Sequence, residues 1–169
     1  LFAAGRRERA FEQFDIAHRQ NNELNRPEIA MALLHVRHGE LERADAWFAK
    51  AMQANPRDAS ARYEYALLLL MQDRAVEAEE QAKQAAVLGM DTAGLDLHRG
   101  RIARQLRKWK EAEVHLRKAL KDVPNHDETF YHLVLTLTDL NQQSLAKEMV
   151  DARKKQPLNT VWARAAVGW

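Results

Sequence analysis

The 169-residue sequence contains no cysteine, which excludes disulfide bonds, thiolate metal ligands and a cysteine nucleophile. Serine occurs only as Ser60 and Ser144, and neither lies in the Gly-x-Ser-x-Gly turn that presents a nucleophilic serine. No glycine-rich loop precedes a lysine in the pattern that binds nucleotide phosphates. Because these catalytic patterns are missing, we predict that this chain segment is not an enzyme and uses no cofactor.

Long apolar runs and an excess of one charge are also missing. The longest apolar run, from Ala66 to Met71, is far shorter than the roughly 20 residues that a membrane-spanning helix needs. The 26 Lys and Arg residues are balanced by 24 Asp and Glu, and the net charge of +2 is too small to attract nucleic acid or a membrane through the overall field. The sequence therefore predicts no membrane insertion and no nucleic-acid partner. The compartment stays open between cytoplasm and periplasm.

Glycine and proline are scarce, with six and four residues, whereas Ala, Leu, Glu, Arg and Gln are abundant. This composition favours helix nearly everywhere, and no alternating strand pattern occurs. The predicted fold class is all-α. The predicted helices cover about 6–20, 26–38, 41–54, 58–72, 75–88, 92–106, 109–122, 126–140, 143–155 and 159–166.

A repeat with a period of 34 residues runs through the chain. Alanine, a large apolar residue, alanine and proline recur 68 residues apart, as Ala44, Phe48, Ala51 and Pro56 and again as Ala112, Leu116, Ala119 and Pro124. Half of that distance is 34, and a frame that starts at Asn25 gives four complete repeats without an insertion: 25–58, 59–92, 93–126 and 127–160. Residues 1–24 are predicted to hold the second helix of a truncated preceding repeat, and 161–169 to form a capping helix or the start of the next repeat.

Fixed positions of the frame carry small residues and helix-ending residues. Position 20 is alanine in all four repeats: Ala44, Ala78, Ala112 and Ala146. Position 8 is small in three repeats, as Ala32, Ala66 and Gly100, and is Val134 in the fourth. Small side chains at these positions predict that helix backbones approach closely there. At the turn inside each repeat, Gly39 and Asn141 are predicted to form left-handed caps. Asp73 and Arg107 occupy the same position, where we expect a tighter or less ideal turn.

The period and the pattern of the second helices resemble the tetratricopeptide repeat family over roughly residues 5–160. The resemblance implies a right-handed α-solenoid of antiparallel helix pairs, in which the first helices line a concave groove that holds a peptide segment or a partner helix. It also implies a non-catalytic protein-interaction scaffold. Position 4 departs from the family, which usually has a large apolar residue there. Only Phe130 conforms, and the other three residues are Glu28, Arg62 and Asp96.

In this family the groove is lined by frame positions 2, 5, 9 and 12, and these positions are mostly apolar in three repeats and basic in the third. The candidate groove residues, with Lys108 added to the basic group, are Ile29, Leu33, Tyr63, Leu67, Leu70, Leu97, Arg101, Arg104, Lys108, Tyr131 and Leu135. They predict apolar and aromatic pockets beside a basic patch, and hence a protein or peptide partner with apolar anchors and an acidic residue. The alternative is that some of these leucines belong to the core, because position 4 is charged.

Histidines and a basic stretch are further candidates for binding sites. His35 and His38 have the i, i+3 spacing of a metal-binding pair, but no third ligand follows, so we predict a packing or capping role and no metal site. Residues 98–108 are rich in arginine, and three interpretations remain open for them: a solvated helix surface, contact with an acidic peptide, or contact with an anionic polymer. No aromatic residue is interleaved with the arginines, which argues against single-stranded nucleic acid.

Two other functions remain open from the sequence. The segment is alternatively a regulatory or substrate-recruiting arm of a larger enzyme or of a secretion or assembly complex. A third hypothesis is a homo-oligomeric rod, because hydrophobic residues near both ends predict either a longer parent array or end-to-end self-association of the fragment.

Overall fold

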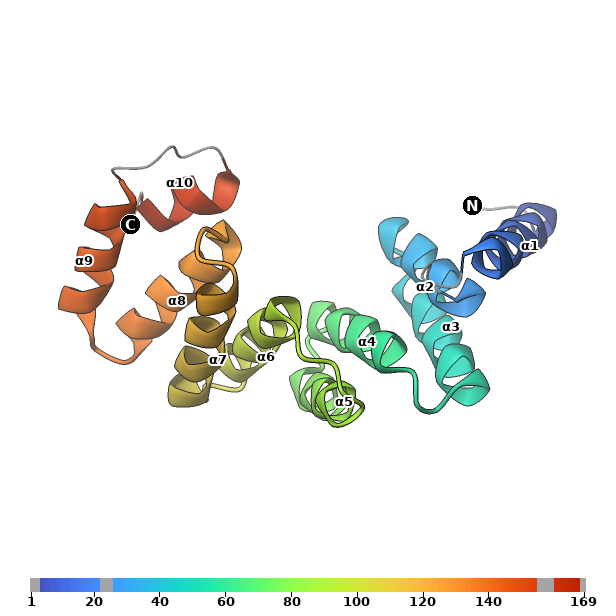
Figure 1. The fold of residues 1–169 in the computed structure, drawn as a ribbon, viewed down its shortest axis with the longest axis horizontal. Coiled ribbons are helices and arrows are strands. Elements are labelled where there is room, and N and C mark those ends of the chain that lie inside the picture. Colours follow the sequence, from blue (N-terminus) through green and yellow to red (C-terminus); the bar gives the residue numbers. More distant parts are fainter. Residues whose placement is uncertain (1–3, 22–25, 155–159, 168–169) are drawn as a thin grey trace. The chain divides into compact units, whose positions relative to one another are not determined.

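A computed structural model describes residues 4–21, 26–154 and 160–167, and this part of the chain contains helices and no strand (Figure 1). Each predicted helix is present, and its ends differ from the prediction by at most two residues. None of the helices in these ranges is long and apolar enough to cross a membrane. The helices are α1 (Ala4–Gln20), α2 (Pro27–Arg37), α3 (Leu41–Ala54), α4 (Ala59–Met71), α5 (Ala75–Val87), α6 (Ala93–Gln105), α7 (Trp109–Asp122), α8 (Asp127–Asp139), α9 (Gln143–Arg153) and α10 (Val161–Val167).

The helices pack in sequential pairs within two compact units, Leu1–Met90 and Asp91–Trp169. In the first unit α2 pairs with α3 and α4 with α5, while α1 packs on α2 and α3 on α4. In the second unit α6 pairs with α7 and α8 with α9, α7 packs on α8, and α10 lies against α8 and α9. This arrangement confirms the predicted all-α helical-repeat fold.

The turns inside the repeats share one backbone conformation. The residue at the same frame position has a positive φ in every repeat, namely Gly39 (70°), Asp73 (62°), Arg107 (57°) and Asn141 (58°). In the third repeat the Arg107 amide donates to the Arg104 carbonyl at 2.9 Å, and the Lys108 amide donates to the Ala103 carbonyl at 2.8 Å. This pair of bonds is a Schellman cap. The left-handed caps at Gly39 and Asn141 are confirmed. The turns at Asp73 and Arg107 are not tighter, because the same two bonds close them, but they hold a non-glycine residue at positive φ.

The first helices of the repeats are capped by side chains 34 residues apart. Asp58 accepts a hydrogen bond from the Ala61 amide at 3.0 Å, and Thr92 accepts one from the Leu95 amide at 3.1 Å. The last two caps in this series are His126, which accepts from the Thr129 amide, and Thr160, which accepts from the Ala163 amide. Each of these bonds satisfies one of the free amides that begin a helix. The segments between repeats therefore supply the N-terminal caps of the helices that follow them.

Small residues allow the helices of a pair to approach closely. All four alanines at position 20 are buried, as are the four residues at position 8. A Cβ on Gly100 would lie only 2.6 Å from Leu116 Cγ, so α6 and α7 touch where the frame predicted. Large apolar residues such as Phe48 and Leu116 fill the space between paired helices and have no exposed surface.

Two of the three charged residues at position 4, Arg62 and Asp96, form polar contacts where the family pattern would place an apolar side chain. Arg62 of α4 donates to the Gln81 side chain at 2.9 Å and to the Pro56 carbonyl at 3.0 Å. Asp96 of α6 is buried, with one oxygen 2.9 Å from His115 Nδ1 and the other 2.8 Å from Lys118 Nζ. In both repeats the position 4 side chain therefore joins the first helix to the second, through hydrogen bonds or ion pairs.

Candidate functional site

The first unit presents an apolar surface on its first helices. On α4, Leu68 and Leu69 are buried in the core, whereas Tyr63, Leu67 and Leu70 are half-buried and share the opposite face through spacings of four and three. The neighbouring helix α2 contributes Leu33, which is half-buried and touches the edge of the core. We call Leu33, Tyr63, Leu67 and Leu70 the first-unit surface.

Two of the predicted groove residues belong to the core. Ile29 of α2 is 1% exposed and packs with Phe48, and Leu97 of α6 is 5% exposed within the core of the second unit. The prediction placed them in the groove because position 5 is a groove position in the family. In this chain the side chain at that position turns toward the second helix in both repeats, and no surface remains for a ligand. Ile29 and Leu97 are therefore not groove residues.

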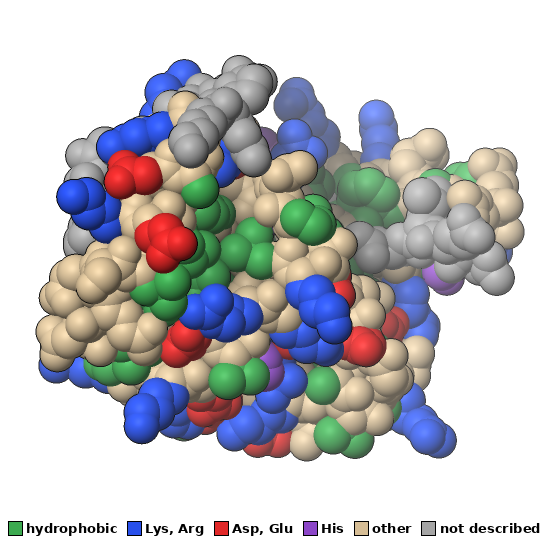
Figure 2. Space-filling view, turned by 60° about the vertical axis from the view of Figure 1, so that its left-hand side comes forward, with side chains coloured by type: hydrophobic (Ala, Val, Ile, Leu, Met, Phe, Trp, Pro, Cys, Tyr) green, Lys and Arg blue, Asp and Glu red, His purple; other side chains and the backbone are tan. Residues whose placement is uncertain are grey.

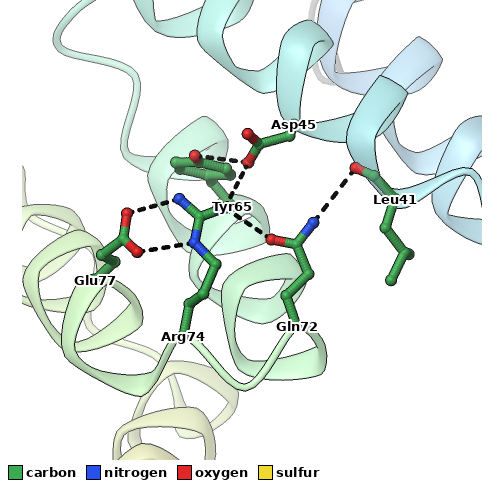
Figure 3. Close-up of polar contacts among 6 residues, drawn as sticks. All are labelled: Leu41, Asp45, Tyr65, Gln72, Arg74 and Glu77. Carbon is green, nitrogen blue, oxygen red and sulfur yellow. Dashed lines mark hydrogen bonds and ion pairs between the residues drawn. The ribbon is translucent and has the colours of Figure 1, made fainter.

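A polar cluster holds the helices behind the first-unit surface in place (Figure 3). The Tyr65 hydroxyl donates to Asp45 at 2.8 Å, and Arg74 reaches Asp45 at 3.2 Å. Arg74 also donates to Gln72 at 2.8 Å and twice to Glu77 at 2.8 and 2.6 Å, so its guanidinium stands between the acidic groups. Burial and the bond to Asp45 raise the pKa of Tyr65 to about 12. The cluster joins α3 of one repeat to α4 and α5 of the next, a contact that was not predicted from the sequence.

The second unit presents an aromatic surface formed by α8 and α10. Tyr131 and Leu135 of α8 are half-buried, and the Trp162 ring of α10 lies 5.2 Å from the Tyr131 ring and 5.7 Å from the His132 ring. Trp162 is 39% exposed. It was not among the predicted groove residues, although it occupies position 2 if the frame is continued past residue 160. Arg101 of α6 is also half-buried. We call Arg101, Tyr131, Leu135 and Trp162 the second-unit surface.

Hydrophobic side chains are also visible in the space-filling view. On the face that Figure 2 brings forward, on the side of the second unit, they gather in a hollow strip, and both basic and acidic side chains lie along its edges. Such a mixture of apolar and charged groups is typical of surfaces that contact another protein.

The predicted basic patch is divided and partly neutralised. Arg101 lies 3.1 Å from Glu128, and Arg104 lies 2.9 Å from Asp139, so both guanidinium groups already have acidic partners. Lys108 is not on the first-helix stripe, because it is the N-cap residue of α7. Arg101 and Arg104 are therefore each paired with an acidic group, and a cationic patch that they share with Lys108 stays a prediction.

Two histidines at the same frame position lie on α6 and α8 of the second unit. Burial lowers the pKa of His98 to about 4 and that of His132 to about 3, and the positive charge of Arg101 acts in the same direction. Both imidazoles are therefore neutral at pH 7. The two ring nitrogens of His132 are buried and have no hydrogen-bond partner among the described residues. These histidines look scattered in the sequence, and their shared frame position is the feature that relates them.

No metal site is formed by the part of the chain that the structure describes. It contains no group of three or more His, Cys, Asp or Glu side chains arranged around one ion. His35 is buried, and its Nδ1 lies 2.6 Å from a Glu40 oxygen at the start of α3. The predicted packing role of His35 is confirmed.

Comparisons with known proteins identify the fold. No protein-family model and no curated protein matches the sequence. Among solved structures, YrrB, described as a tetratricopeptide repeat protein with an unusual peptide-binding site, is 26% identical with a TM-score of 0.75, over 94% of this chain and 82% of that one. The chain therefore has the tetratricopeptide repeat fold.

Two further structures share the fold at lower identity. PilF of Pseudomonas aeruginosa is 19% identical with a TM-score of 0.72, over 95% of this chain and 67% of PilF. Yeast Tom70 is 18% identical with a TM-score of 0.75, over 97% of this chain and 36% of Tom70. At these identities the likeness concerns the fold alone.

Proposed function

We propose that this protein is a protein-interaction scaffold that binds a peptide segment or a partner helix on the first helices of its repeats. The contacts are made by the first-unit surface and by the second-unit surface, each within its own unit. The proposal is supported by the tetratricopeptide repeat fold and by the peptide-binding site named for YrrB.

The observation that carries the proposal is the second apolar face of α4. One face of α4, with Leu68 and Leu69, is buried in the core. On the other face, Leu67 and Leu70 are only half-buried and lie on the same side of the helix as Tyr63. A helix that is apolar on two sides is normally covered on both. Covering these three side chains with apolar groups of a partner removes further surface from water, at about 25 cal/mol for each Å² buried. Tyrosine is also among the side chains that most often anchor an interface.

The framework behind the surface limits the entropy cost of binding. Tyr65, Asp45 and Arg74 tie α3 to the next repeat, so α4, which carries Tyr63, Leu67 and Leu70, is held in place before a partner arrives. A preorganised surface loses little conformational freedom on association.

The partner is expected to present apolar or aromatic anchors first and an acidic group second. One nitrogen of the Arg101 guanidinium donates to Glu128 in the free protein, so a carboxylate of the partner would bind the remaining N–H groups or compete with Glu128 for that nitrogen. An acidic residue in the partner therefore adds specificity for the second-unit surface, while Tyr131, Leu135 and Trp162 supply the contact area.

Site-specific photo-crosslinking tests the proposal. The photoreactive residue p-benzoylphenylalanine replaces Tyr63 or Tyr131, both aromatic, and in a control chain it replaces Val76, an exposed residue of α5. After irradiation in a lysate of the source organism, crosslinked peptides are identified by mass spectrometry. We expect one partner segment to be captured from position 63 or 131 and not from position 76.

Competition makes the result specific to the surface. A Leu67→Glu/Leu70→Glu variant, checked by circular dichroism for equal helicity, should lose the crosslink from position 63, because two charges would be buried under the partner. Capture that is equal at positions 63 and 76, or that survives the two glutamates, would reject the proposed surface. The identity of the captured protein then separates a simple scaffold from the recruiting arm of a larger complex.

A further inference from the structure

The turn between α6 and α7 forms a shallow pocket whose lining includes no residue of the two first-helix surfaces. The residues that line it come from this turn, from the first turn of α7 and from the end of α8, and they are Arg107, Lys108, Trp109, Lys110, Glu111 and Leu140. Its volume is about 430 Å³, and its wall is mainly apolar, with three basic residues against one acidic residue. We call these six residues the loop pocket.

Basic charge distinguishes this turn from the equivalent turns of the other repeats. The four residues that begin at the left-handed position are Arg107, Lys108, Trp109 and Lys110 here. The corresponding segments are 39–42 with sequence GELE, 73–76 with DRAV and 141–144 with NQQS, and none of them combines an aromatic residue with more than one cation. The fold itself requires none of these side chains, because the same Schellman bonds form in each turn.

Two cations of the loop pocket, Arg107 and Lys110, differ from Arg104 of α6 in their pairing. Arg104 is held by Asp139, and its guanidinium lies over the Trp109 ring at 5.7 Å from the ring centre. By contrast, Arg107 and Lys110 are exposed and form no ion pair within the described ranges of the chain. Arg107 also keeps a left-handed backbone with a φ of 57°, which costs a non-glycine residue about 1 kcal/mol or more.

We propose that the loop pocket binds an acidic peptide segment in which an apolar side chain is flanked by carboxylates. The apolar side chain contacts Trp109 and Leu140, and the carboxylates on either side pair with Arg107 and Lys110. This site is separate from the first-helix surfaces and does not depend on the function proposed for them. It would let the scaffold hold a second peptide.

A peptide fits the pocket better than a membrane or a nucleic acid. Attachment to an anionic membrane commonly uses clusters of four to eight cations with several apolar side chains that enter the lipid. The loop pocket offers three cations, and Trp109 is partly buried under Arg104. Single-stranded nucleic acid is commonly bound by several aromatic rings on which successive bases stack, whereas Trp109 is the one aromatic residue among the six of the loop pocket. A short acidic segment matches both the size of the pocket and its charge.

Nuclear magnetic resonance with a defined probe tests this proposal. The probe is the blocked peptide acetyl-Asp-Glu-Phe-Glu-Asp-amide, and the matched neutral probe is acetyl-Asn-Gln-Phe-Gln-Asn-amide. The indole N–H signal of Trp109, assigned with a Trp109→Phe variant, is followed during titration. We expect the acidic peptide to shift this signal in a saturable manner, with binding that weakens as salt is raised, and the neutral peptide to bind at least about fivefold more weakly.

A pair of charge-reversal variants on α7 provides the matched control. Lys110→Glu should weaken binding of the acidic peptide about fivefold or more. Lys121→Glu makes the same change of charge at an exposed residue in the last turn of α7 and should leave the affinity unchanged. Tyr131→Ala on the second-unit surface should also leave it unchanged.

Three outcomes would overturn the assignment. The first is that the acidic peptide leaves the Trp109 signal in place. The second is that the two variants weaken binding equally, which indicates a general charge effect. The third is that vesicles of phosphatidylserine and phosphatidylcholine, and not the peptide, bind in a manner that depends on Lys110.

Discussion

Leu116 of α7 fills the space in which a side chain on Gly100 of α6 would stand. A Cβ built on Gly100 would lie 2.6 Å from Leu116 Cγ and 2.7 Å from Cδ2. Leu116 is fully buried, so it has no open space into which it can withdraw. The two helices can therefore pack at this distance only because one of the pair has no side chain.

Gly100→Ala should destabilise the second unit. Alanine favours a helix over glycine by about 0.5–1 kcal/mol, but overpacking of a close core contact costs about 1–3 kcal/mol. We expect a net loss of about 1–2 kcal/mol in the free energy of unfolding, measured by urea denaturation. The control is a Leu116→Ala background, in which the added methyl group should be neutral or stabilising. An equal loss in both backgrounds would contradict the contact.

The left-handed turns predict one substitution that lowers the stability of the protein and one that raises it. A Cβ on Gly39 would have no neighbouring atom within 4 Å, so Gly39→Ala should cost about 1 kcal/mol through its φ of 70° alone. Arg107 has the same conformation with a full side chain, so Arg107→Gly should stabilise the protein by up to about 1 kcal/mol. Thermal unfolding of the two variants measures the effects. A loss of stability in Arg107→Gly would show that the arginine side chain contributes more than its backbone strain costs.

Most of the fold follows from regularities that are local in the sequence. The 34-residue period, the alanines at position 20 and the cap residues depend on helix geometry and on the size of single side chains, so they predict helix ends to within two residues. The left-handed conformation of Arg107 was not predictable from its own preference. It follows from the turn, whose two hydrogen bonds outweigh the preference of one residue.

The candidate site was less predictable, because its residues depend on how side chains turn. Ile29 and Leu97 occupy groove positions in the frame but point into the core. Arg101 pairs with Glu128, which is 27 residues away on another helix. Spacing rules within one helix do not predict such a pair. Trp162 was missed for a simpler reason, since the frame was stopped at residue 160.

Removing Lys118 and removing Asp96 should change the free energy of unfolding by different amounts, although the two side chains form one ion pair. Lys118→Ala would leave the carboxylate of Asp96 buried with only His115 nearby, and we expect a loss of about 1–2 kcal/mol in the free energy of unfolding. Asp96→Leu removes the buried charge itself, and Lys118 keeps Asp91 at 2.6 Å. That variant should be neutral or stabilising, because a leucine restores an apolar residue at position 4. Urea denaturation compares the two, and equal losses would reject the explanation.

His132 should make the second unit sensitive to acid. Burial and the nearby Arg101, Arg104 and His98 hold the pKa of His132 at about 3, well below the ordinary value of 6.5. Glu128 is the acidic group that faces it, at 3.9 Å from Nε2. Because the unfolded chain binds a proton more readily, stability is complete above about pH 6.5 and falls as the pH is lowered toward 3.

His132→Phe tests this dependence, because it keeps a ring beside Tyr131 and Trp162 and removes the titrating group. The slope of unfolding free energy against pH between about 6 and 4 should decrease by up to about 1.4 kcal/mol for each pH unit, the value for one proton. Urea denaturation at several pH values measures it. Val114→Ala, at an exposed position of α7 that carries no titrating group, is the control and should keep the wild-type slope. An unchanged slope in His132→Phe would mean that this imidazole is protonated in the folded protein as readily as in the unfolded chain.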